Sequence, residues 1–141
     1  MVIKDSTSYY LIHFANELRT KLEQLMLEIG LHSGQAMIME SLWEKNCQSQ
    51  ADLVRSLSVT PPTVYNMVVR LVKAEFVETK KLDTDARIVL VCLTQKGIEL
   101  QPLFRERWAK LEHQMLANLN ETEAMMFSLL LKKLKPSEEF R

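Results

Sequence analysis

Residues 49–81 read SQADLVRSLSVTPPTVYNMVVRLVKAEFVETKK, and residues 82–94 continue as LDTDARIVLVCLT. The first stretch predicts two short helices with a tight connection, and Pro61 suits the first position of the second helix because no hydrogen bond is lost there. Residues 77–82 and 87–93 alternate as two strands around the polar tip DTDA. Together they predict a helix-turn-helix followed by a β-wing, an arrangement that enters a DNA groove.

The helix expected over residues 61–74 has two different faces. Apolar residues at helical spacing predict the buried face: Val64, Met67, Val68 and Leu71. Six residues lie off that stripe, and their polar groups include hydroxyls, an amide and a guanidinium: Thr63, Tyr65, Asn66, Val69, Arg70 and Lys73. A solvated helix usually has Glu and Lys at such positions, whereas these groups read base edges and phosphates. DNA contact is therefore expected, and an ordinary solvated face is the alternative.

Three cations lie on or beside the expected hairpin, at Lys80, Lys81 and Arg87. A basic hairpin next to a recognition helix can contact the sugar-phosphate backbone or insert an arginine into a narrow minor groove. Asp85 lies two residues before Arg87, so the two can pair and stiffen the tip. A hairpin that is basic only for solubility is the alternative.

The sequence predicts long helices at both ends of the chain. Their apolar stripes are too long to be buried by the helix-turn-helix and wing alone. One helix runs to about Ile29 before Gly30, one from Thr94 to about Leu119, and a last one begins at Asn120 and is stopped by Pro136. The expected fold is mainly α (α+β), as a single domain. Its parts are a winged helix-turn-helix lobe with a two-stranded wing (32–97) and terminal dimerisation helices (1–31 and 98–141).

Composition limits the possible functions. The chain has 141 residues and a net charge of 0, from 18 basic and 18 acidic residues, which counts against a general, non-specific nucleic-acid binder. It has no run of 18 apolar residues, and its N-terminus lacks the features of a signal peptide, so no membrane association and a cytoplasmic location are expected. With no Gly-rich phosphate loop, metal-spaced cluster or nucleophile elbow, we expect no enzyme activity, no cofactor and no metal.

Cys47 and Cys92 lie far apart in the sequence and have no CxxC spacing. A structural disulfide is therefore not expected, and a reducing compartment is. Cys92 is expected to be a buried small residue, and Cys47 to lie in a polar linker. A cysteine-based redox-sensing regulator is kept as an alternative.

The run RLVKAEFVETKKLDTDARIVLVCLTQKG, residues 70–97, resembles the MarR family of bacterial transcriptional regulators. The resemblance is carried by the Arg70-Leu71 pair, by Asp85-Ala86-Arg87, and by the L-x-L-T-x-x-G pattern over residues 91–97 (here Val91 at its first position). The order of elements also matches along the whole chain. The resemblance implies a homodimer that places two recognition helices in successive major grooves of a pseudo-palindromic operator in double-stranded DNA, acting as a repressor.

The patterns and the resemblance together predict one set of DNA-binding residues: Ser49, Thr60, Pro62, Thr63, Tyr65, Asn66, Arg70, Lys80, Lys81, Asp85 and Arg87. The family often binds aromatic acids, which implies a small aromatic or phenolic effector in a pocket of Tyr10, His13 and Trp43; core or dimer packing is the alternative there. A winged-helix dimer that acts through protein contacts alone is an alternative for the whole chain.

Two positions depart from the family pattern. Glu75 replaces the glycine usual in the turn after the recognition helix, and Thr79 replaces an arginine frequent in the first wing strand. The turn must then form without the free φ of glycine. The base of the wing is expected to hold DNA less tightly.

Overall fold

The computed structural model describes residues 1–134, so the expected stop at Pro136 and the segment 135–141 lie outside it. The chain forms helices and a small sheet, which confirms the mainly α (α+β) winged-helix prediction. The elements in order are a 3₁₀ turn (Ile3–Asp5), α1 (Thr7–Leu27), α2 (Ser33–Glu44), β1 (Gln48–Ser49), α3 (Gln50–Leu57), α4 (Pro61–Lys73), β2 (Val77–Leu82), β3 (Asp85–Leu93), α5 (Gln95–Met115) and α6 (Glu121–Lys133).

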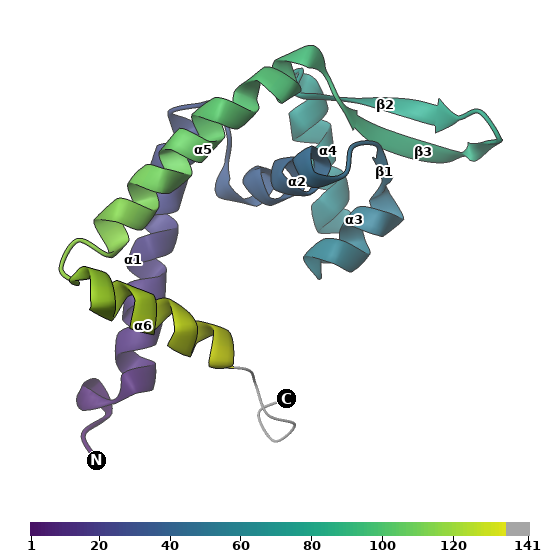
Figure 1. Ribbon diagram of the computed structural model, residues 1–141. Coiled ribbons are helices and arrows are strands. Elements are labelled where there is room, and N and C mark those ends of the chain that lie inside the picture. Colours follow the sequence, from purple (N-terminus) through teal and green to yellow (C-terminus); the bar gives the residue numbers. More distant parts are fainter. Residues whose placement is uncertain (135–141) are drawn as a thin grey trace.

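The molecule has a head and a helical stem. The head holds α2, α3 and α4, and the β2–β3 hairpin projects from it (Figure 1). In the stem α1 contacts α5, and α6 follows α5 at the end remote from the wing (Figure 1). The start of α1 and the whole of α6 therefore lie away from the wing (Figure 1).

Side-chain caps start four of the helices. The hydroxyls of Ser6, Ser49 and Thr94 accept the backbone N–H of the residue three positions on, at 3.3, 3.1 and 3.1 Å. Asn120 does the same for α6 at 2.8 Å. Each cap satisfies a backbone donor that the first helical turn leaves without a partner.

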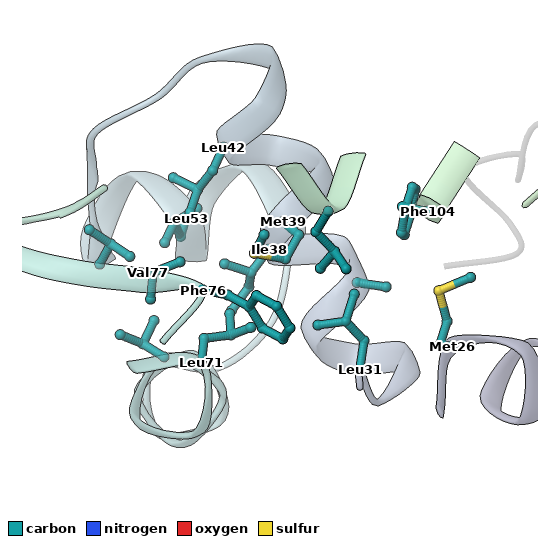
Figure 2. Close-up of a cluster of buried hydrophobic side chains, with 14 of the residues drawn as sticks. Met26, Leu31, Ile38, Met39, Leu42, Leu53, Leu71, Phe76, Val77 and Phe104 are labelled. Carbon is teal, nitrogen blue, oxygen red and sulfur yellow. The ribbon is translucent and has the colours of Figure 1, made fainter. Parts of the chain in front are cut away.

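One hydrophobic core joins the head to the stem. Phe76, which follows α4, lies among Leu31, Ile38 and Leu71, and Phe104 of α5 lies at the far side of the same cluster (Figure 2). Each fully buried side chain of this kind stabilises the fold by about 1.5–3 kcal/mol relative to exposure. The core therefore fixes the end of α4 against both α2 and the stem.

The turn after α4 forms without glycine. Glu75 takes a left-handed φ of 66°, and the N–H of Phe76 bonds to the carbonyl of Leu71 at 3.1 Å. A non-glycine residue in this conformation costs about 1–2 kcal/mol. The prediction that the turn must form without glycine's freedom is confirmed.

The L-T-x-x-G pattern has a structural reason at this turn. The Thr94 hydroxyl donates to the Glu75 carbonyl at 2.6 Å, and the Thr94 N–H donates to the Phe76 carbonyl at 3.1 Å. A Cβ on Gly97 would lie 2.1 Å from that Phe76 oxygen, so only glycine fits. Trp43 donates its indole N–H to the Gly97 carbonyl at 3.0 Å, which ties α2 to the same point.

The sheet differs from the expected two-stranded wing. Its order is β1-β3-β2, all antiparallel, with β3 central. Gln48 and Ser49 of β1 pair with Val91 and Leu90. A strand of two residues has no detectable periodicity, so no pattern in the sequence indicated it.

The expectation of no disulfide was wrong. Cys47 and Cys92 are bonded to each other, with Cα atoms 4.2 Å apart. Because Gln48 pairs with Val91 in an antiparallel ladder, Cys47, just before β1, lies opposite Cys92 on β3. The unpredicted β1 is thus the reason that two cysteines distant in sequence meet. Cys92 is buried, as predicted.

Glu23 joins α1 to the start of α2. Its carboxylate accepts the Ser33 N–H at 2.8 Å and contacts His32 Nδ1 at 2.6 Å. Hydrogen bonds from the backbone and side chain of Ser33, and from His32, lower the pKa of Glu23 from 4.5 to about 2. A carboxylate with a lowered pKa stabilises the folded state above its unfolded pKa, and this contribution is lost as the pH falls through the folded pKa.

We expect Glu23→Gln to lower the free energy of unfolding by about 1 kcal/mol near neutral pH, as loss of a charged helix cap does. The difference from the unsubstituted protein should shrink as the pH falls from 4.5 towards 2. Urea denaturation at neutral pH and near pH 3 measures it. Glu17→Gln, in the exposed part of the same helix, is the control. An equal loss at both pH values would contradict the role of the Glu23 charge.

Candidate DNA-binding surface

The recognition helix α4 is fixed by one face and open on the other. Val64, Val68 and Leu71 are buried in the core, and the remaining predicted residues lie outward. Tyr65 has 56% of its surface exposed, and Asn66, Arg70 and Pro62 are exposed as well. The helix therefore presents a phenol, an amide and a guanidinium in one surface.

Polar residues of α4 border a pocket of about 360 Å³ that they share with the end of α1 and the start of α2. Thr63, Asn66 and Arg70 line it from α4, opposite Glu23 and His32. The structure thus brings three of the predicted residues together. The hydroxyls of Thr63 and Thr60 lie 2.8 Å apart, which orients both at the N-terminus of the helix.

The wing tip holds a paired arginine. The backbone N–H, Nε and Nη2 of Arg87 donate to the Asp85 carboxylate at 3.0, 3.1 and 3.2 Å. These bonds lower the pKa of Asp85, which keeps it charged. The Arg87 side chain is nevertheless 91% exposed. Asp85 therefore fixes the direction of the guanidinium while most of it stays open to a ligand.

The base of the wing is less cationic than its two lysine residues suggest. Lys80 lies 3.1 Å from the Glu78 carboxylate, which neutralises part of its charge, and Lys81 is exposed. Thr79, the departure from the family pattern, lies on the same strand and pairs with Val91. Ser49 is half-buried and its hydroxyl caps α3, so that group is already occupied within the head.

The residues predicted for an effector pocket do not meet. Tyr10 lines a groove of about 410 Å³ between α1, α5 and α6, and His13 is exposed and packs on Tyr9. Trp43 packs on Phe104 instead. A different pocket of about 560 Å³ lies between α2 and α5 and is lined by Met37, Glu40, Phe104, Arg105, Trp108, Ala109 and Glu112.

Val69 and Val72 belong to the exposed face of α4 but are missing from the predicted set. They expose 46% and 41% of their surfaces. The helical spacing predicts that Val69 lies outside the buried face of α4. It is not in the predicted DNA-binding set because its apolar side chain cannot hydrogen-bond to DNA. Its helical spacing from Tyr65 is the signal that could have included it.

Two kinds of feature are absent from residues 1–134. No helix there is long and apolar enough to cross a membrane. In the same part of the chain no three His, Cys, Asp or Glu side chains gather as a metal site would require.

Comparisons with known proteins agree with this geometry. The MarR family model matches residues 31–89, from the start of α2 into β3. No curated protein matches the chain in sequence. Among solved structures, wild-type apo MarR from E. coli is 23% identical, with a TM-score of 0.80 over 93% of this chain and 97% of that one.

Two further solved structures share the fold. A cysteine-to-serine mutant of E. coli MarR complexed with operator DNA is 24% identical, with a TM-score of 0.80 over 96% of this chain and 99% of that one. BpsR from Bordetella bronchiseptica, whose DNA binding is regulated by 6-hydroxynicotinic acid, is 20% identical, with a TM-score of 0.82 over 98% and 99%. The resemblance found in the sequence is confirmed: the MarR family model matches residues 31–89, which include most of the winged helix, and the whole chain has the fold of these solved structures.

Proposed function

We propose that this MarR-type chain is a sequence-specific regulator of transcription that binds double-stranded DNA as a homodimer and acts as a repressor. The observation that carries the proposal is the exposed face of α4, on which Tyr65, Asn66 and Arg70 lie outward, on the same head as the open guanidinium of Arg87. Such a helix suits the major groove, and such a tip suits the adjacent backbone or minor groove.

The neutral charge of the chain is compatible with this role. The 18 acidic residues balance the 18 basic ones over the whole chain, whereas Arg70, Lys73, Lys81 and Arg87 are cations of the head and wing. Local cations suffice for a specific complex in which base contacts add to phosphate contacts.

The helical stem supports the homodimer. Within the described residues, α6 has no buried side chain, and Met126, Leu129 and Leu130 are exposed on it. Tyr10 and Phe14 of α1 are exposed beside the groove that α1 forms with α5 and α6. Exposed apolar surface on this scale is typical of an interface between subunits. We propose residues 1–31 and 98–141 as the dimerisation part and residues 32–97 as the DNA-binding lobe.

We expect Leu130→Glu to raise the dimer dissociation constant by about 100-fold, because the change buries one carboxylate from each chain in an apolar interface. Light scattering over a range of concentrations measures the shift. Ile88→Glu, a matched exposed apolar residue on the wing, is the control and should leave the dimer intact. A stable monomer of the unsubstituted protein would refute the dimer proposal.

We expect Arg87→Ala to weaken binding to specific and random duplexes alike, because its contact is to backbone or groove.

Asn66→Ala should instead relax discrimination at particular bases, by about 1–3 kcal/mol for each lost base contact. Fluorescence anisotropy with a duplex selected from a random pool measures both. A binding constant that does not change with salt would refute the regulator and favour a winged-helix dimer acting through protein contacts.

The DNA-binding titration, repeated with and without a reductant, also tests the role of the disulfide. Cys47–Cys92 links the start of the helix-turn-helix to the central wing strand, so it bears on the redox-sensing alternative. Equal DNA affinity with and without a reductant would leave the bond a structural link. An affinity that changes on reduction would favour the redox-sensing regulator.

The pocket between α2 and α5 suits an aromatic effector better than the predicted set of Tyr10, His13 and Trp43, which do not form one pocket. Phe104 and Trp108 supply aromatic walls, and Arg105 supplies a cation for a carboxylate. With benzoate as the probe, we expect quenching of tryptophan fluorescence, and an Arg105→Gln variant should bind about tenfold more weakly. Lys110→Gln, an exposed cation of the same helix outside the pocket, is the control. Equal quenching in both variants would exclude this pocket.

A further inference from the structure

The exposed face of α4 consists of two parallel ridges. Each ridge has the spacing i, i+4, i+7, which places its members above one another on a helix. One ridge is polar and contains Asn66, Arg70 and Lys73. The other, displaced by one residue, is apolar and contains Tyr65, Val69 and Val72.

The apolar ridge is not part of the core. Val64 and Val68 are buried within the same helix, whereas Val69 exposes 46% of its surface. Valine is a poor helix former, so a helix face that stays in water gains nothing from it. A row of exposed apolar side chains is typical of a binding surface, and a partner would need apolar groups at matching spacing.

The two ridges occupy opposite flanks of one surface. The polar ridge borders the head through His32 and Gln35, with which Arg70 lines two adjoining pockets. The apolar ridge does not line either of these pockets and lies on the other flank. Any ligand that covers α4 from outside therefore meets both ridges at once.

Duplex DNA offers groups for both. In the major groove, thymine presents a C5-methyl group next to an acceptor oxygen, while the other bases present donors and acceptors for amide and guanidinium groups. We propose that Tyr65, Val69 and Val72 contact the C5-methyl groups of thymines at fixed positions of each half-site. This assignment rests on the proposed DNA-binding function and names the apolar part of its specificity.

The surroundings of the ridge favour DNA over a protein as the occupant. A protein that covered the whole outer face would have to pair Asn66 and Arg70 as well as cover Tyr65 and Val69. The wing, which projects from the same head (Figure 1), carries Lys81 and Arg87, which suit phosphates. The apolar ridge is thus continuous with a surface whose other groups match DNA.

The test replaces single thymines by deoxyuridine in a duplex that the full-length protein selects from a random pool. Deoxyuridine pairs normally but lacks the C5-methyl group. At one or two positions of each half-site we expect the affinity to fall about fourfold for each methyl lost, as burial of one methyl-sized group provides. Equal affinity for thymine and deoxyuridine at every position would overturn the proposal. It needs no variant and remains decisive if a substituted chain fails to fold.

Variants assign the effect to the ridge. In Val69→Ala, at least one sensitive position should bind thymine and deoxyuridine equally. Asn66→Ala, on the polar ridge, should bind more weakly but keep the full sensitivity to deoxyuridine. If Val69→Ala keeps it as well, Val69 does not contact the methyl group. If the pool yields no bound duplex at all, the proposed function itself fails, which is a distinct outcome.

Discussion

The structure depends on one close contact, where the first turn of α5 meets the end of the recognition helix. The absent side chain of Gly97 lets α5 pass against the Phe76 carbonyl, and Thr94 bonds to Glu75 and Phe76 at the same place. Trp43 joins α2 to it through the Gly97 carbonyl. Because these bonds leave little freedom, the head and α5 are expected to move as one body.

This junction fixes the position of the head relative to the stem. A head fixed to α5 takes its position from whatever holds the stem, so pairing of two stems would set the distance between two recognition helices. The wing is held at both sides of its root: β2 follows the Phe76 turn, and β3 is linked to β1 through Cys47–Cys92. The side chains proposed to read DNA therefore extend from a supported frame, and Asp85 directs the arginine at the free tip.

The sequence predicted those features that depend on neighbours along the chain. Caps at Ser6, Ser49, Thr94 and Asn120 were predictable because a cap and its target lie three residues apart. The two faces of α4 were predictable from its 3.6-residue period. The Asp85–Arg87 pair was open to prediction because its members lie only two positions apart.

The features that the sequence did not reveal are those that depend on the meeting of distant segments. The disulfide needed the pairing of β1 with β3, and two residues carry no strand period. The residues predicted for an effector pocket lie apart because Tyr10 and Trp43 face different neighbours, which only packing determines. The sequence by itself determined the order, the caps and the faces of the helices, because these follow from local spacing. The tertiary structure alone decided which faces meet, because that depends on the fit of side chains remote in the chain.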